Sequence, residues 1–194
     1  MTDVILAESA GFCFGVERAV AMTEKALETG GLYSLGELIH NRDAVGRLEA
    51  KGLRAVPDAA SVPAGARVVI RSHGVSRAEL ELLRDKGCEL IDATCPRVSR
   101  IHRIVERAAA EGRRVVIFGE PSHPEVQGIC GWCEGAFVAQ ELDSFLGGAG
   151  EMGISPETPI TVVFQTTSHK KTSEQIINSL KKEYTNAKFF DTIC

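Results

Sequence analysis

The sequence predicts an α/β fold made of repeated small lobes arranged with pseudo-threefold symmetry around a common centre. One observation is an internal repeat, because residues 32–95 and residues 115–194 share the same order of strand, turn and helix patterns. Another is that Cys13, Cys95 and Cys194 each follow a short apolar run of strand type. Such self-similarity is the signature of a chain built from copies of one supersecondary unit.

Size and composition bound the class of protein. With 194 residues, of which 44% are hydrophobic and 25% charged, the chain can form a globular protein with a substantial core. A net charge of −4 and the lack of a basic run with interleaved aromatics argue against a nucleic-acid partner. The start Met1-Thr2-Asp3 lacks the basic n-region of a signal peptide. No apolar run approaches the roughly 18 residues of a membrane span. We therefore expect a cytoplasmic protein without a membrane partner.

The first half of the repeat contains a shared G-E-x-x-H pattern. Residues 32–56 read as a strand, Gly36-Glu37-Leu38-Ile39-His40, a short helix and a second strand. Residues 115–139 repeat this order around Gly119-Glu120-Pro121-Ser122-His123. In both copies a histidine therefore follows the carboxyl end of a strand, where open parallel sheets place their ligands.

The second half of the repeat closes on a cysteine. Residues 68–95 read as a strand, a polar turn with His73, a helix, a strand and Cys95. Residues 161–194 read as a strand, a polar turn, a helix, a strand and Cys194. The two halves together make one lobe of the type β-α-β…β-α-β, so the chain holds two copies of it.

Local signals predict where three helices begin. Capping boxes combine a serine or threonine with an acidic or amide side chain three residues later. Pro96 directly after Cys95 fits a first helical position, which predicts a helix over 97–111 with Cys95 as its cap. The two capping boxes are Ser76 with Glu79 and Thr172 with Gln175.

The repeat divides the chain into three parts. Residues 14–95 form a first α/β lobe and residues 96–194 a second. Cys13 looks like the closing cysteine of a lobe that does not precede it. We therefore expect residues 1–13, with a strand over 3–8, to belong to a third lobe whose remainder would follow Cys194. In the alternative, Cys13 follows a separate strand outside any threefold arrangement.

The recurrence of three cysteines favours metal binding over packing. A thiol at a strand-to-helix turn faces the positive end of a helix dipole, which favours the thiolate that binds metals. The wide spacing of Cys13, Cys95 and Cys194 differs from the local pairs of zinc fingers and suits a cluster between lobes. Three protein ligands leave one coordination place open, which indicates catalysis. We interpret the lone Cys88 as a small core residue.

Cys130 and Cys133 form a C-x-x-C pair, which suggests half of a zinc site or a thiol redox couple. A redox couple normally lies directly after a strand, at the start of a helix. This pair instead lies late in the segment 128–135, and the chain has no second pair. We interpret both residues as incidental thiols near the surface and keep a zinc or thiol-redox protein as an alternative function.

Three of the five histidines occupy strand-exit turns. His40, His73 and His123 follow strand ends, whereas the other two lie within a helix pattern and in a polar run. Converging imidazoles and hydroxyls, Thr166 among them, can bind an anion through side chains in a chain that lacks a Walker-type loop.

Glu125 lies two residues after His123. A carboxyl group in a half-buried pocket beside an anion favours its protonated form and can donate a proton. On the residues alone, a solvated glutamate is an equal alternative.

Five motifs carry a resemblance to a known family: Gly11-Phe12-Cys13-Phe14-Gly15-Val16, Ile70-Arg71-Ser72-His73-Gly74-Val75, Asp92-Ala93-Thr94-Cys95-Pro96, His123-Pro124-Glu125-Val126 and Gln165-Thr166-Thr167. Over all 194 residues, and in the same order, the chain resembles the 4-hydroxy-3-methylbut-2-enyl diphosphate reductases, the LytB/IspH family. The resemblance implies three α/β lobes around a central iron–sulfur cluster. It also implies the last step of the methylerythritol phosphate route, which forms isopentenyl and dimethylallyl diphosphate.

The resemblance implies how the cluster is held and reduced. Cys13, Cys95 and Cys194 would hold a [4Fe–4S] cluster whose fourth iron binds the allylic hydroxyl of the substrate. Ferredoxin or flavodoxin would deliver two electrons, one at a time.

The same resemblance implies how the substrate is bound. His40, His73 and His123 would face the diphosphate and hydroxymethyl region, with Thr166 beside the substrate hydroxyl. Glu125 would supply the proton with which this oxygen leaves as water.

The chain departs from the family pattern at its end. The family continues past the third cysteine with a lobe that carries a Ser-x-Asn motif and a later serine, and residues 1–194 contain no such lobe. We therefore expect the native gene product to extend by about 90 residues if the third lobe resembles the other two. An inactive fragment of the reductase is a further alternative.

Overall fold

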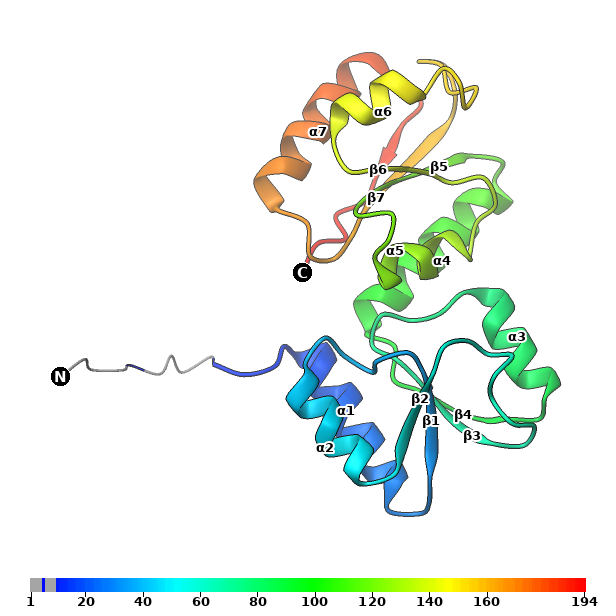
Figure 1. Cartoon of the computed structure of the whole chain (residues 1–194). Helices are drawn as coiled ribbons and strands as arrows, with labels where there is room; N and C mark the ends of the chain where they lie inside the picture. The colour runs from blue at the N-terminus through cyan, green and yellow to red at the C-terminus, as the bar shows by residue number, and fades with distance from the viewer. Residues whose placement is uncertain (1–4, 6–9) are drawn as a thin grey trace.

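The computed structural model describes Ile5 and residues 10–194. Most of the strand expected over 3–8 lies outside the described residues. Two four-stranded sheets are present, and all of their strand pairs are parallel (Figure 1). We refer to the segment from α1 to β4 as lobe 1 and to the segment from α4 to β8 as lobe 2.

Lobe 1 is built on the first sheet, whose strand order is β2-β1-β3-β4. Its elements are α1 (Phe14–Leu27), β1 (Leu32–Leu35), α2 (Arg42–Ala50), β2 (Leu53–Val56), β3 (Arg67–Ile70), α3 (Arg77–Asp85) and β4 (Glu89–Asp92). Lobe 2 has the order β6-β5-β7-β8. Its elements are α4 (Pro96–Ala110), β5 (Arg114–Phe118), α5 (Pro124–Cys130), β6 (Phe137–Ala139), α6 (Leu142–Gly148), β7 (Ile160–Phe164), α7 (Lys170–Glu183) and β8 (Lys188–Phe189).

The two sheets confirm the repeat that the sequence predicts. Their strand orders are equivalent, and the turns that follow them share a hydrogen bond. The backbone N–H of Cys95 donates to the carbonyl of Ser72 at 3.0 Å, and that of Cys194 donates to the carbonyl of Thr166 at 2.8 Å. One difference is α6, because the corresponding segment 57–66 of lobe 1 contains no helix. The boundary between residues 95 and 96 stays a prediction.

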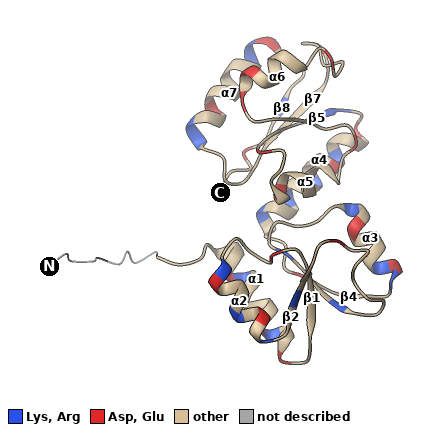
Figure 2. Cartoon of the chain, viewed as in Figure 1, with Lys and Arg blue, Asp and Glu red and all other residues tan. Residues whose placement is uncertain are grey.

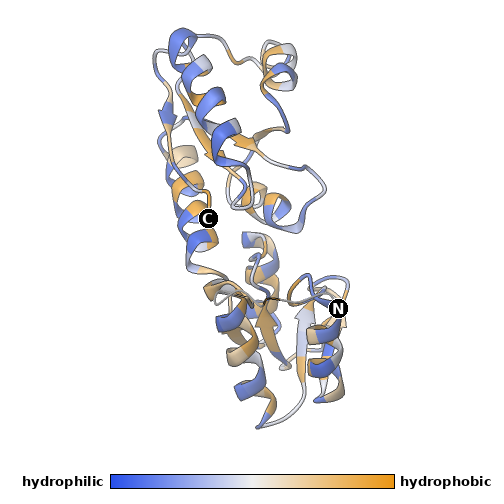
Figure 3. Cartoon of the chain, turned by 90° about the vertical axis from the view of Figure 1, so that its left-hand side faces the viewer, coloured by the Kyte–Doolittle hydropathy of each residue, from blue (hydrophilic) through white to orange (hydrophobic). Residues whose placement is uncertain are grey.

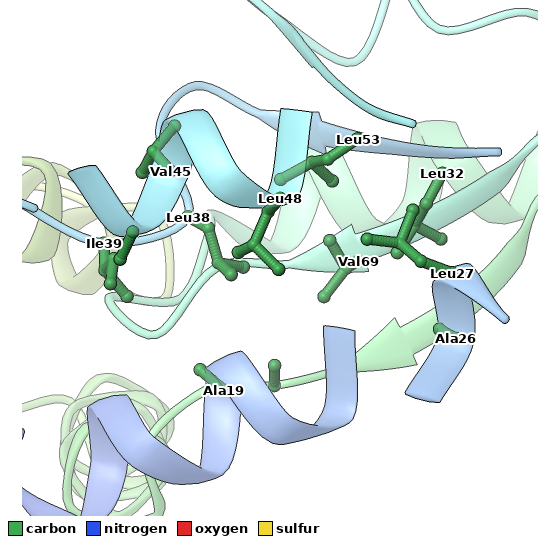
Figure 4. Close-up of a cluster of buried hydrophobic side chains, with 12 residues drawn as sticks. Ala19, Ala26, Leu27, Leu32, Leu38, Ile39, Val45, Leu48, Leu53 and Val69 are labelled. Atoms are coloured by element: carbon green, nitrogen blue, oxygen red, sulfur yellow. The ribbon is translucent and has the colours of Figure 1, made fainter. Parts of the chain in front are cut away.

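Each sheet is covered on both faces, as a parallel sheet requires. In lobe 1, α1 and α2 pack on one face through Ala19, Leu48 and Val69 (Figure 4). Leu83 of α3 belongs to the cluster that covers the other face. All five residues of β7 are buried in lobe 2. Figure 3 shows the apolar residues gathered on the strands and the inner helix faces, and Figure 2 shows charged residues mostly on the outer helix surfaces.

The helix starts test the local signals one by one. Ser76 and Glu79 form the predicted capping box of α3, and Cys95 is the N-cap of α4 with Pro96 in its first turn. The box expected at Thr172 is wrong, because α7 begins at Lys170 with His169 as N-cap. The N–H of Ser168 donates to the carbonyl of Gln165, which forms a tight turn directly after β7. The chain therefore enters the helix two residues before Thr172.

The lobes meet around the turn that follows α5. The indole N–H of Trp132 donates to the carbonyl of Val75 at 2.9 Å, and the Trp132 ring stacks on His102 of α4. The backbone N–H of Arg77 donates to the carbonyl of Gly131 at 3.3 Å. These contacts fix the strand-exit turns of one lobe against those of the other. The C-terminal residue lies on the side of lobe 2 that faces lobe 1 (Figures 1 and 3).

Candidate active site

Three histidine rings from both lobes come together between the sheets. His40 follows β1, His73 follows β3, and His123 is the N-cap of α5. The ring centroids are 4.2 Å apart for His40 and His73, 5.3 Å for His40 and His123, and 5.6 Å for His73 and His123. The grouping thus joins the carboxyl edges of two parallel sheets, where such sheets bind ligands.

Buried neighbours and glycines hold the histidine turns in place. Leu38 and Ile39, directly before His40, are at most 1% exposed. The N–H of Ser72, next to His73, donates to the carbonyl of Leu38 at 3.3 Å. Gly74 has a φ of +73°, and a Cβ there would come within 2.5 Å of Cε1 of His102. Only glycine combines this left-handed backbone with so close a contact.

His73 and His123 are neutral at pH 7. The pKa of His73 is lowered to about 3, first by burial and then by the charges of His40, His123 and Arg71. Burial also lowers the pKa of His123, against the opposing effect of Glu125. The Nδ1 atom of His73 is buried and has no hydrogen-bond partner among the described residues.

The tautomer of His123 favours an anion over a metal ion. The ring nitrogens of the three histidines lie within 4.8 Å of one another, a spacing that admits a metal ion. However, Nδ1 of His123 accepts the backbone N–H of Glu125 at 3.1 Å. In the neutral ring the proton is then on Nε2, which becomes a donor and cannot be a ligand. The free nitrogen of His123 is therefore suited to a negatively charged oxygen.

Glu125 and Thr166 form a buried hydrogen-bonded pair. Glu125 is 2% exposed and Thr166 is 7% exposed. The backbone N–H of Thr166 donates to Oε1 of Glu125 at 2.7 Å, and its hydroxyl donates to Oε2 at 2.6 Å. The solvated glutamate, which the sequence left open, is therefore excluded. Since Thr166 also accepts the N–H of Cys194, the pair lies directly beside that cysteine.

Cys13 and Cys95 occupy equivalent positions at helix starts. Cys13 is the N-cap of α1 and Cys95 the N-cap of α4, and neither uses its side chain to cap the helix. The Sγ of Cys95 lies against the first turn of α1, because a Cβ on Gly15 would come within 2.6 Å of it. Both thiols therefore remain free to bind a ligand near the start of α1.

Cys194 lies near enough to Cys95 and Cys13 for both of them to act on its pKa. Burial raises the pKa of the Cys194 thiol, the charge of Arg97 opposes this rise, and Cys95 and Cys13 add to it. Nη1 of Arg97 lies 3.5 Å from the carbonyl of Ile193, so the first turn of α4 touches the chain just before Cys194. Three sulfur donors suit an iron–sulfur cluster, and the absence of a side chain at Gly15 leaves space beside the Cys95 sulfur.

The other three cysteines lie apart from this group. Cys133 is 6% exposed and packs in the core of lobe 2, so the expectation of a near-surface thiol is wrong for it. Burial raises the pKa of Cys130 and, to about 12, that of Cys133. Protonated, buried thiols are poor nucleophiles and poor metal ligands. Cys88 is half-buried against the outer core of lobe 1, in line with the packing role expected for it.

The sequence reasoning missed three residues that contact the site. Gly15 makes room for Cys95, and Arg97 lies beside Cys194. Arg71 extends between the histidine turns, with Nε donating to the carbonyl of Gly74 at 3.2 Å. The available signal was position alone, because each of these residues stands within two residues of a candidate site residue in sequence.

Comparison with known proteins identifies the family. The sequence profile of the LytB protein family matches residues 4–194. The chain belongs to the LytB family. It is 38% identical over 198 residues to the 4-hydroxy-3-methylbut-2-enyl diphosphate reductase of Caldanaerobacter subterraneus, covering 99% of this chain and 67% of that relative. The protein of the same name in Aquifex aeolicus is also 38% identical, over 100% of this chain and 67% of its own length.

Solved structures of LytB-family reductases share this fold. A structure described as that of the terminal enzyme of the non-mevalonate pathway has a TM-score of 0.81 at 38% identity, covering 100% of this chain and 69% of that chain. The reductase of Plasmodium falciparum has a TM-score of 0.87 at 26% identity, covering 96% and 59%. The α/β architecture of repeated lobes is thus confirmed. The LytB relatives extend beyond the two thirds of their length that this chain spans.

Proposed function

We propose that this chain forms two lobes of an oxidoreductase that converts 4-hydroxy-3-methylbut-2-enyl diphosphate to isopentenyl and dimethylallyl diphosphate, the last step of the methylerythritol phosphate route. One observation carries the proposal beyond family membership. Three imidazoles from both lobes lie together, and the buried Glu125–Thr166 pair contacts the backbone of Cys194, on whose pKa Cys95 and Cys13 also act. A reductive dehydroxylation of a diphosphate needs three kinds of group: ligands for a metal cluster, a proton donor and an anion-binding site.

The three thiols would hold a [4Fe–4S] cluster. Cys13, Cys95 and Cys194 come from separate helix starts and strand ends, and the other cysteines are buried or half-buried elsewhere. When bound, the cluster supplies electrons and an iron with an open coordination place that acts as a Lewis acid. Burial raises the pKa of the Cys194 thiol, and the positive charge of Arg97 opposes this rise, which favours the thiolate that such binding needs.

The histidines would hold the diphosphate. Nε2–H of His123 points away from its bond with the Glu125 backbone and is free to donate to a phosphate oxygen. His73 is half-buried and neutral, and His40 is exposed beside it. N–H donors in a partly dry pocket bind anions with little reorganisation, because the turns already hold them in place.

Glu125 would provide the proton for the leaving oxygen. The net change at the substrate takes up two electrons and two protons, breaks the carbon–oxygen bond and releases water. Hydroxide is a poor leaving group, so this oxygen must gain a proton as the bond breaks. Oε2 of Glu125 and the Thr166 hydroxyl are 2.6 Å apart. When Glu125 is protonated this bond would reverse, so that the carboxyl donates to the hydroxyl and Thr166 can pass its own proton to an oxygen beside it.

A ferredoxin or flavodoxin is the proposed electron donor, and the cytoplasm is the proposed compartment. All six cysteines are free thiols, as a reducing compartment favours. No helix in the described part of the chain is long and apolar enough to span a membrane.

Anaerobic turnover tests the proposal. The reconstituted chain is compared with a version extended by a segment equivalent to the part of the relatives that it does not match. With substrate and a reduced one-electron donor, we expect the extended protein to form both products, and the 194 residues alone to bind weakly and turn over poorly. Absence of both products from the extended, iron-loaded protein would contradict the proposed function. Full activity of the isolated 194 residues would contradict the need for a third lobe.

A further inference from the structure

The two half-buried imidazoles of the proposed anion site, His73 and His123, contribute no positive charge. His73 and His123 are neutral at pH 7, because burial lowers the pKa of both rings. An allylic diphosphate carries several negative charges. Moving them from water into a partly buried pocket is unfavourable unless a cation compensates. A cation should therefore be found close to these rings.

Arg71 is positioned to be that cation. It follows β3 directly, two residues before His73. Its Nε donates to the carbonyl of Gly74, and its Nη1 lies so close to Gly36 that a Cβ there would come within 2.9 Å. The side chain therefore extends from the His73 turn to the start of the turn that carries His40.

Among the described residues, Arg71 forms no ion pair with a carboxylate. Burial lowers the pKa of Arg71, and Glu79 acts in the opposite direction. Oε2 of Glu79 accepts both the backbone N–H and the hydroxyl of Ser76 in the capping box, so this carboxylate is held at the start of α3. A guanidinium remains charged at neutral pH in such a setting.

The positive charge of Arg71 acts on the imidazoles of His73 and His123. It contributes to lowering the pKa of His73 and of His123. The other charged or titratable groups that face these rings are His40 at both, and Glu120 and Glu125 at His123. The acidic pair therefore acts on the lobe 2 side, and Arg71 supplies the positive potential from lobe 1.

We propose that Arg71 is the fixed positive charge of the anion site formed by His40, His73 and His123, and that it positions the His73 turn through the Gly74 carbonyl. The proposal rests on the proposed function and assigns to this site a residue that acts by charge. It also explains why the guanidinium is held between two glycine-containing turns instead of extending into solvent.

Pyrophosphate binding tests the charge. Inorganic pyrophosphate is titrated by calorimetry into the wild-type chain and into three variants, Arg71→Gln, Arg71→Lys and, as control, Arg54→Gln on exposed β2. We expect Arg71→Gln to weaken binding roughly tenfold or more, as for loss of a charged partner. Arg71→Lys keeps the charge and should restore most of the affinity, and Arg54→Gln should bind like wild type.

Histidine titration without ligand gives a second readout, which a purely structural role would not move. Removing a nearby positive charge favours the imidazolium, so Arg71→Gln should raise the pKa of His73 and His123, and Arg71→Lys should reverse the change. Nuclear magnetic resonance of the ring protons measures both, and thermal unfolding confirms that each variant is folded.

The outcomes separate the two proposals. If wild type binds pyrophosphate, His73→Ala abolishes binding and Arg71→Gln changes neither affinity nor histidine titration, the role of Arg71 is overturned and the proposed function stands. If the wild-type chain does not bind pyrophosphate at all, the role of Arg71 is overturned, and turnover of the extended protein decides the proposed function.

Discussion

At the scale of single residues, burial and hydrogen bonding decide which side chains can act. Glu125 resembles many surface glutamates in the sequence, yet both of its oxygens are bound by Thr166 in the interior. Cys133 is part of a suggestive C-x-x-C pair, yet burial raises its pKa to about 12. The residue type and spacing predicted neither environment, because both depend on how lobe 2 packs.

Replacing Glu125 by Gln should remove the proton donor and keep the fold. A Gln side chain has nearly the same shape and can still accept the Thr166 N–H, but it cannot give up a proton. We expect turnover in the complete enzyme to fall roughly 10²-fold or more, with iron content and substrate binding retained. The exposed Glu174→Gln on α7 is the matched control and should remain active. Near-normal turnover of Glu125→Gln would show that the proton comes from another group.

His102 should make the fold sensitive to acid. It is 5% exposed, and burial lowers its pKa to about 4. The unfolded chain takes up a proton below pH 6.5, whereas the folded chain does so only near pH 4, so unfolding becomes easier as the pH falls through this window. The loss approaches about 3 kcal/mol at the lower limit.

Unfolding free energies measured between pH 6.5 and 4 check this prediction. His102→Gln should flatten the dependence on pH, whatever its effect on stability at neutral pH. The exposed His169→Gln is the control and should leave the slope unchanged. A slope that is the same in wild type and His102→Gln would mean that His102 is charged in the fold.

At the scale of elements, strands were easier to predict than helix ends. Apolar runs such as 160–164 identify buried parallel strands, and the Ser76 capping box marks α3 correctly. Thr172 was misleading because a capping box is only a local preference. The tight turn after β7 leads the chain into α7 at Lys170, two residues before the local signal.

Gly15, in the first turn of α1, should be needed for binding of the iron–sulfur group. A methyl group there would come within 2.6 Å of the Cys95 sulfur and push it away. We expect Gly15→Ala to weaken binding of the iron–sulfur group about tenfold or more, as other changes around metal ligands do. Iron content after anaerobic reconstitution at limiting iron measures this loss.

Gly46→Ala is the matched control, because a Cβ at this position in α2 meets nothing within 4 Å. Alanine favours a helix, so this variant should keep its iron and gain up to about 1 kcal/mol of stability. Equal iron content in both variants would argue against a metal mount at the start of α1.

At the scale of the whole molecule, the repeat predicted the lobes but not their contact. Two similar strand–helix patterns are enough to predict two parallel sheets and polar groups at their carboxyl edges. That His123 of lobe 2 lies beside His40 and His73 of lobe 1 depends on the Trp132 junction, for which the sequence has no periodic signal. The repeat placed the three histidines at strand-exit turns and indicated an anion site, and the family resemblance identified that anion as a diphosphate.

The central claim is that three of the six cysteines form the metal mount, and one measurement tests it most directly. Iron and sulfide bound per chain are determined after anaerobic reconstitution for wild type, Cys13→Ser, Cys95→Ser and a variant with Cys88, Cys130 and Cys133 all replaced by Ala. We expect wild type and the triple variant to bind an iron–sulfur cluster, and the two single variants to lose it. Loss of iron from the triple variant, with iron retained in Cys95→Ser, would contradict the assignment.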